Sequence, residues 1–162
     1  MEISIDEFDR KILTILQGDA ARPVADIAKQ VGLSPTPCWR RIRLLEEAGV
    51  IRGRVALLDR GKLNVGVTVF VAVRTNQHNQ DWLERFARAV DSIPEVVEFY
   101  RMAGDIDYLL RVVVPDIAAY DGVYKRLIQN IDLTDVSSTF AMEELKYTTA
   151  VPLTYAARSS AG

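Results

Sequence analysis

The sequence from Val31 to Leu45, Val-Gly-Leu-Ser-Pro-Thr-Pro-Cys-Trp-Arg-Arg-Ile-Arg-Leu-Leu, determines how the first third of this chain folds. Gly32 allows a sharp turn after a preceding helix. Ser34 suits the position just before a new helix, and the proline after it suits the first turn, where a missing N–H costs nothing. Because Pro37 also has no N–H, we expect the Ser34 hydroxyl to cap the N–H of Thr36. These signals predict the turn and second helix of a helix-turn-helix.

The two faces of this second helix differ in chemistry. At about 100° per residue, Cys38, Ile42 and Leu45 fall on one face and suit a domain core. The opposite face carries four polar or aromatic residues: Thr36, Trp39, Arg40 and Arg43. A hydroxyl, an aromatic ring and two guanidinium groups are typical of a surface that contacts base edges and phosphates. The alternative is an ordinary surface helix whose arginines meet only water and carboxylates.

Each candidate for DNA contact has an expected role. Arg40 and Arg43 are expected to contact bases or phosphates, because a bidentate arginine–guanine pair contributes ~1–3 kcal/mol of discrimination. Ser34 and Thr36 are expected to position the helix against a phosphate through their hydroxyls and the helix N-terminus. Trp39 has two interpretations, a contact with thymine methyl groups or sugar, and packing on the first helix.

Three further arginines also have two interpretations each. Arg41 lies at the flank of the helix, where it either contacts a phosphate or forms an intramolecular ion pair. Arg52 and Arg54 follow the helix and either reach backbone phosphates or are solvated.

The charge of the chain is distributed unevenly. The 162 residues have a formal net charge of −2. Six arginines nevertheless lie between Arg40 and Arg60, opposed only by Glu46, Glu47 and Asp59. DNA affinity grows with the number of phosphates neutralised, so one copy of this small basic surface would bind weakly. Several copies are therefore expected to act together.

Composition excludes several classes of protein. A single cysteine, Cys38, rules out an internal disulfide and suits a reducing cytoplasm, where we expect it as a small buried hydrophobe. The one histidine, His78, is expected in a solvated loop, and one histidine with one distant cysteine makes no zinc site. No segment has the apolar length that spans a bilayer, and the first residues do not resemble a signal sequence. We expect a cytoplasmic protein without a metal or membrane contact.

Hydrophobic periodicity divides the chain into four parts. Residues 1–50 are expected to form a winged-type helix-turn-helix DNA-binding domain. Its helices are expected from about Asp6 to Gln17, from Pro23 to Gly32 and from Ser34 to Gly49. Residues 51–64 are expected to be a linker strand and hinge, because Val50 to Leu58 has a strand pattern. Residues 65–150 form a second domain, and residues 151–162 form a tail that is expected to be loose from Ala156 onward.

The second domain is predicted to be a ferredoxin-like βαββαβ sandwich, which makes the whole chain α+β. Strands are expected at Val65–Arg74, Val96–Ala103, Tyr108–Val114 and Val136–Thr149, and helices at Asp81–Ile93 and Ile117–Ile131. The first of these strands is apolar nearly throughout, which favours cover on both sides of the sheet. Two sheets paired face to face would supply that cover, so residues 65–149 are predicted to build an obligate homodimer.

Two motifs carry a family resemblance. The first runs from Leu33 to Cys38 and continues through Arg40, Arg41, Ile42, Leu45, Glu46 and Gly49. The second is Gly104 to Leu110, with Met142 to Glu144 further on. From about Asp6 to Thr149 the chain resembles the Lrp/AsnC group of bacterial and archaeal feast/famine transcription regulators, most of all its leucine-responsive branch. The resemblance implies a regulator of double-stranded DNA whose dimers assemble into octameric rings or stay smaller.

The resemblance also implies an effector site and no other cofactor. A small amino acid would bind between subunits and change assembly or DNA affinity. Its contacts would cluster at the loop of Gly104, Asp105 and Asp107, where N–H groups meet the carboxylate and an aspartate pairs with the ammonium group. Tyr100 and Thr139 would line the side-chain pocket. The alternative is a plain hairpin turn whose aspartates cap their own backbone.

Two other functions compete with amino-acid-responsive regulation. An enzyme would find carboxylates here, at Asp105, Asp107, Glu143 and Glu144. No nucleophile–base pair, metal cluster or phosphate-binding glycine loop accompanies them, so catalysis is not expected. The second alternative is an architectural DNA-compacting protein with little dependence on a ligand. Two departures from the family, Trp39 and the sequence Asn130 to Leu133, leave base preference and one pocket wall open.

Overall fold

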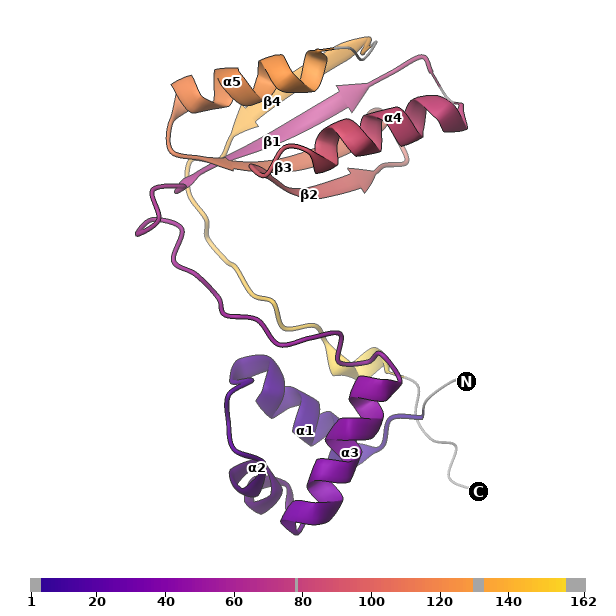
Figure 1. Ribbon diagram of the computed structural model, residues 1–162, viewed down its shortest axis with the longest axis vertical. Coiled ribbons are helices and arrows are strands. Elements are labelled where there is room, and N and C mark those ends of the chain that lie inside the picture. The colour runs from indigo at the N-terminus through magenta and orange to yellow at the C-terminus, as the bar shows by residue number, and fades with distance from the viewer. Residues whose placement is uncertain (1–3, 78, 130–132, 157–162) are drawn as a thin grey trace. The chain divides into compact units, whose positions relative to one another are not determined.

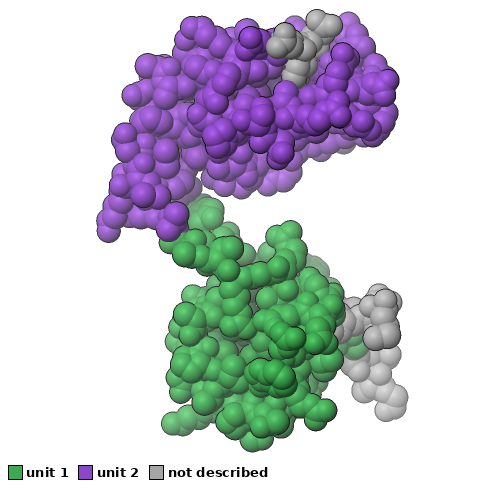
Figure 2. All heavy atoms as spheres, viewed as in Figure 1, with its two compact units in different colours: residues 1–57, 146–162 green, residues 58–145 purple. Residues whose placement is uncertain are grey.

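The computed structural model describes residues 4–77, 79–129 and 133–156. The chain divides into two compact units, one of residues 1–57 and 146–162 and the other of residues 58–145 (Figures 1 and 2). No helix in the described ranges combines the length and the apolar character needed to cross a membrane. The predicted loop at His78 and the predicted helix end at Ile131 lie outside the described residues.

Three helices form the first unit: α1 (Glu7–Gly18), α2 (Val24–Val31) and α3 (Pro35–Glu47). Gly32 has a φ of 77°, a left-handed conformation that ends α2 and turns the chain toward α3. Ser34 precedes α3 in an extended conformation as predicted, but its side chain makes no capping hydrogen bond. That prediction is wrong. Pro37 removes the N3 donor used in capping boxes, and the hydroxyl does not bond the remaining N–H of Thr36.

The inward face of α3 is the one that periodicity predicts. Cys38, Ile42 and Leu45 are all buried. Two of them join the main core of this unit, which also contains Ile12, Leu16, Ile27, Ala28 and Val31. This packing fixes which side of α3 faces solvent.

The strand predicted at Val50 to Leu58 is not formed. This stretch contains no strand, so the described part of the first unit has no wing strand. Val55 is 80% exposed, and Leu57 and Leu58 are exposed as well. A strand requires a hydrogen-bonded neighbour, and no described segment pairs with this one.

The C-terminal segment packs on the first unit. A short 3-10 helix, η1 (Leu153–Tyr155), places Leu153 and Ala156 against a small apolar cluster of Ile5, Leu13 and Leu45. The Val151 N–H donates to Gln17 Oε1 at 2.6 Å, and Gln17 Nε2 donates back to the Val151 carbonyl at 3.3 Å. Residues 151–156 are therefore attached to the first unit. The tail was predicted to be loose from Ala156 onward, but Ala156 itself packs on this cluster, and the rest of the tail lies outside the described residues.

The second unit is a four-stranded antiparallel sheet with two helices on one face (Figure 1). Its elements are β1 (Val67–Arg74), α4 (Gln80–Asp91), β2 (Val96–Arg101), β3 (Tyr108–Val114), α5 (Ile117–Ile128) and β4 (Asp135–Phe140). The strand order is β2-β3-β1-β4. The predicted βαββαβ order is confirmed.

Some element ends differ from the prediction. The strand predicted to run to Thr149 ends at Phe140. It pairs with β1, which begins at Val67, so beyond Ala141 no part of β1 remains to accept its hydrogen bonds. On α5, Ile117 at the first position is 71% exposed, while Val123 is buried.

The faces of the sheet differ sharply. Val69, Val71 and Val73 of β1 point toward the helices and are fully buried. They meet an aromatic cluster of Trp82, Phe86, Phe99 and Tyr108, whose ring centroids lie 5.1–5.7 Å apart. The opposite face has no helix and is called the open face below.

Leu153→Ala tests the attachment of the C-terminal segment. Removing a half-buried side chain should lower the free energy of unfolding by about 1–2 kcal/mol, below the cost of emptying a fully buried site. Denaturant unfolding at fixed protein concentration measures this change. Thr154→Ala, an exposed neighbour in the same turn, is the matched control, and equal stability of the two variants would contradict the packing described.

Candidate DNA-binding surface and effector site

The exposed face of α3 carries an aromatic ring beside an arginine that has no ion pair with a described residue. Trp39 is 53% exposed, so its ring is not buried against the first helix. Arg40 is exposed, and no ion pair joins it to a described residue. Ser34 and Thr36 are exposed at the start of the same helix. These four residues leave a positive, hydrogen-bonding surface at one end of α3.

Two other arginines make contacts with carboxylates on the surface. Arg43 lies 3.4 Å from Glu46 and 3.6 Å from Glu47, within its own helix. Arg54 lies 3.1 Å from Glu46 and also donates to the Ala20 carbonyl. Exposed ion pairs of this kind contribute about 0–1 kcal/mol and are readily exchanged. Arg52 is exposed and has no ion pair with a described residue.

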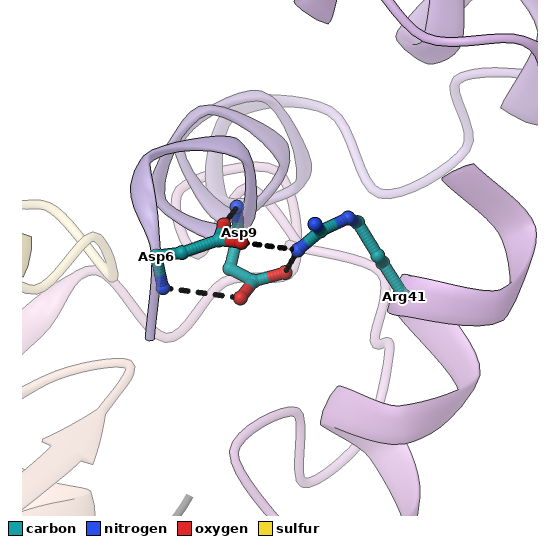
Figure 3. A network of polar contacts seen from close by, with 3 residues as sticks. All are labelled: Asp6, Asp9 and Arg41. Carbon is teal, nitrogen blue, oxygen red and sulfur yellow. Dashed lines mark hydrogen bonds and ion pairs between the residues drawn. The ribbon is translucent and has the colours of Figure 1, made fainter. Parts of the chain in front are cut away.

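Arg41 is placed differently from the other arginines of α3. Its Nη1 atom donates to Asp6 Oδ2 at 2.7 Å and to Asp9 Oδ1 at 2.9 Å (Figure 3). The guanidinium carbon lies 5.3 Å from the centre of the Phe8 ring. Burial alone would lower the pKa of Arg41, but the hydrogen bonds that Arg41 donates to Asp9 and Asp6 raise it above the ordinary value. Of the two predicted interpretations, the structure has the intramolecular ion pair.

The loop predicted to hold an effector connects β2 to β3. Gly104 has a φ of 130°, which only glycine adopts readily. Asp107 Oδ2 accepts from the Thr75 N–H at 2.8 Å. The carbonyl of Asp105 accepts from Arg74 Nε at 2.8 Å. The loop is therefore fastened to the end of β1, and the Asp107 carboxylate is already engaged with backbone, although not with its own turn.

Tyr100 and Thr139 are not brought together. Both lie on the open face, Tyr100 on β2 and Thr139 on β4. These are the two edge strands, separated by three strand spacings or about 14 Å. Within one chain, the five predicted effector residues therefore do not surround a single small pocket.

The open face contains a polar network that the sequence analysis missed. Glu98 Oε1 accepts from Arg111 at 2.6 Å, and Tyr100 donates to Glu98 Oε2 at 3.1 Å. The hydrogen bond from Arg111 is the main reason that the pKa of Glu98 lies below its ordinary value. Glu98 and Arg111 sit on adjacent strands, and only the strand register reveals that they face each other.

Asp6 and Asp9 were also missed as partners of Arg41. Their spacing at the start of a helix is the signal of a capping box, and could have been recognised as such. The pairing with an arginine 32 residues further along the chain could not, because it depends on how the helices pack. In the described part of the chain, no three histidine, cysteine or carboxylate side chains group together to hold a metal ion.

A three-helix unit with a helix-turn-helix, followed by an α+β unit, defines the class of ligand-binding transcription regulators. An AsnC-type helix-turn-helix domain matches residues 5–46, and an Lrp/AsnC ligand-binding domain matches residues 68–151. The chain belongs to the Lrp/AsnC family. It is accordingly a DNA-binding transcription regulator with an amino-acid ligand-binding domain, not an enzyme.

Three relatives illustrate the similarity. The glutamate uptake regulatory protein of Zymomonas mobilis is 54% identical over 149 residues, which cover 92% of this chain and 91% of that protein. An AsnC family regulator from Agrobacterium tumefaciens has a crystal structure with 66% identity and a TM-score of 0.90, over 93% of this chain and 98% of that one. A Neisseria meningitidis regulator solved with L-Met has 35% identity and a TM-score of 0.88 over the same shares.

The network on the open face predicts a dependence of stability on pH. A carboxyl whose pKa is lowered by folding contributes stability above its ordinary pKa, here 4.5, and loses it as the pH falls through the lower folded value. Glu98→Gln removes this contribution. The free energy of unfolding of that variant should therefore fall less steeply than the wild-type value as the pH drops below 4.5.

Urea unfolding at a series of pH values, at one protein concentration, checks this. Glu143→Gln is the matched control, because Glu143 is exposed and has no ion pair with a described residue. Identical slopes for the Glu98 variant and the wild type would show that the Arg111 pair does not contribute.

Proposed function

We propose that this chain is a sequence-specific transcription regulator whose DNA binding or assembly responds to a small amino acid. One observation carries the DNA-binding half of the proposal. Arg40 and Trp39 stand exposed on the outer face of a helix whose inner face is fully buried. A bare arginine on a rigid helix suits a bidentate contact with guanine or a phosphate, and an indole ring suits a thymine methyl group or sugar.

The neighbouring residues are assigned supporting roles. Ser34 and Thr36 meet a phosphate near the N-terminus of α3, where the helix dipole favours negative charge. Arg43 leaves its ion pairs with exposed carboxylates and binds DNA instead, because those ion pairs are weak. Arg52 and Arg54 reach backbone phosphates in the same way. The protein acts in the cytoplasm, where its DNA is accessible.

The effector half of the proposal places the amino acid at the loop between β2 and β3. Gly104 lets the loop present N–H groups to the ligand carboxylate. Asp105 pairs with the ligand ammonium group, because its carboxylate is exposed and the Asp107 carboxylate already holds Thr75. Asp107 therefore shapes the loop. The Neisseria relative with bound L-Met supports an amino acid as the ligand class.

A complete pocket requires a second copy of the chain. Tyr100 and Thr139 lie on opposite edges of one sheet, so one ligand meets both only if they come from different subunits. We propose that residues 65–149 form a homodimer through the open face, and that dimers assemble further, up to an octamer. On this face Phe70 is 39% exposed and Tyr100 is 49% exposed, an apolar surface that a monomer would leave in water.

A charge at Phe70 tests the homodimer. Phe70→Glu would place a carboxylate in the middle of the dimer interface, where burial without a partner is costly. Sedimentation at micromolar concentration should give dimers or larger species for the wild type and a smaller species for the variant. Ile117→Glu, at an exposed apolar residue at the start of α5 in the same unit, is the control, and a monomeric wild type would contradict the proposal.

A thermal-shift screen against the twenty amino acids tests the effector. A ligand that binds only the folded state raises the melting temperature, by an amount that corresponds to about 2.7 kcal/mol at a concentration 100 times its Kd. We expect one amino acid or a small chemical group of them to do so. Asp105→Asn should abolish the shift, while Asp107→Asn should weaken it through the loop.

The same screen distinguishes the proposed amino-acid-responsive regulator from the second candidate function. If no amino acid shifts the melting temperature at millimolar concentration, the amino-acid effector is refuted. An architectural DNA-compacting protein would then be favoured, provided that binding is independent of sequence and falls steeply with salt.

A further inference from the structure

The two carboxylates that hold Arg41 also cap the first helix. The Asp9 N–H donates to Asp6 Oδ1 at 2.9 Å, and the Asp6 N–H donates to Asp9 Oδ2 at 3.1 Å. This reciprocal pair is a capping box. Each carboxylate uses one oxygen for the cap and its other oxygen for Arg41. All four oxygens are thus engaged by one short network.

The network is partly buried. Asp9 is among the few charged residues that are buried, and the Arg41 guanidinium lies against the Phe8 ring. Burial opposes ionisation of Asp6, but the hydrogen bond from Asp9 and the ion pair with Arg41 hold the pKa of Asp6 below its ordinary value. Arg41 is the one cation of this network, so its removal leaves two carboxylates without a counter-charge, whereas removal of the Asp9 charge leaves Arg41 with Asp6 alone.

The position of Arg41 on α3 makes this network an orienting contact. At about 100° per residue, Arg41 lies beside the buried stripe of Cys38 and Ile42, while Arg40 points to the opposite side. Hydrophobic packing resists separation of the helices but tolerates small rotation and sliding, because it is not directional. A hydrogen-bonded ion pair at defined atoms is directional. It fixes the rotation of α3 relative to the start of α1.

We propose that Arg41 is a positioning residue for DNA recognition: through Asp6 and Asp9 it sets the orientation in which α3 presents Arg40 and Trp39 to base pairs. This inference rests on the proposed DNA-binding face of α3. It removes Arg41 from the set of direct DNA contacts. It also gives the N-cap of α1 a part in sequence discrimination, although α1 need not touch DNA.

If Arg41 instead contacts a DNA phosphate, a substitution of its partner Asp9 should have the opposite effect on DNA affinity. Asp9→Asn keeps an oxygen for the cap but weakens the pairing with Arg41. If Arg41 positions the helix, this variant should lose sequence-specific affinity, as Arg41→Met does. If Arg41 contacts phosphate, Asp9→Asn should leave DNA affinity unchanged or improved, because it removes a negative charge and one of the two carboxylates that hold the arginine.

The experiment uses the full-length chain and a duplex selected from a random pool by the wild-type protein, with an unselected duplex for comparison. Dissociation constants are measured over a series of salt concentrations, well below each melting temperature. Arg41→Met and Asp9→Asn should each lose roughly tenfold or more on the selected duplex and less on the unselected one. The double variant should lose no more than either single variant. Arg41→Lys, which can bridge both carboxylates with one nitrogen, should recover part of the loss.

Salt dependence separates positioning from direct binding to phosphate. Arg41→Met should keep the wild-type slope of log affinity against log salt. Arg40→Met, the matched control on the outer face, should lower the magnitude of that slope by about 0.9 for each phosphate that it leaves unneutralised in a bound subunit. A reduced slope for Arg41→Met together with intact binding by Asp9→Asn would overturn the proposal.

The proposal would also be overturned if the variants are less stable but still discriminate the selected duplex from the unselected one as the wild type does. The network would then contribute to stability alone. An unchanged affinity for Arg40→Met would instead contradict the proposed DNA-binding face, whatever the result for Arg41.

Discussion

Burial of one face of α3 is the constraint on which the DNA-binding unit depends. Cys38, Ile42 and Leu45 lie in the interior, and each fully buried apolar side chain contributes about 1.5–3 kcal/mol relative to exposure. Because an α-helix is rigid, burying this stripe fixes the opposite stripe outward. Trp39 and Arg40 are exposed for that reason. The hydrophobic effect determines the exposed face, and in the proposed account the ion pairs of Arg41 define its orientation more closely.

In the second unit, packing likewise buries one face and exposes the other, but here the faces are those of a sheet. Two helices cover one face of the sheet and leave the other bare (Figure 1). Phe70 and Tyr100 remain in water on that face, next to the ion pair of Glu98 and Arg111. Exposed aromatic side chains on a bare sheet face can be covered by a second sheet, packed about 10 Å away. Association and ligand binding are therefore linked in the proposed account, since residues expected around one ligand come from two chains.

The sequence alone was sufficient for most of the fold. The order of elements follows from periodicity and from local signals such as Gly32, and the buried face of α3 was predicted correctly. The strand from Val50 to Leu58 was not, because a strand depends on a partner that no local pattern specifies. The attachment of Leu153 and the pairing of Arg41 with Asp9 also depend on contacts between distant parts of the chain.

The candidate sites were predictable to different degrees. The buried and exposed faces of α3 could be predicted residue by residue, because helix geometry determines which residues share a face. The predicted effector site is a loop with two strand residues, and where those strand residues lie could not be predicted without the sheet order. Tyr100 and Thr139 have suitable chemistry, yet lie on opposite edges of the sheet.

The two tryptophans allow a direct test of the central claim that the outer face of α3 contacts DNA. Trp39 is exposed on that face, and Trp82 is buried in the other unit. Their indole N–H signals can be recorded by NMR and assigned with Trp39→Phe. On addition of duplex DNA, the account predicts that the Trp39 signal shifts or broadens while the Trp82 signal stays in place. A Trp39 signal that does not respond under conditions where DNA is bound would contradict it.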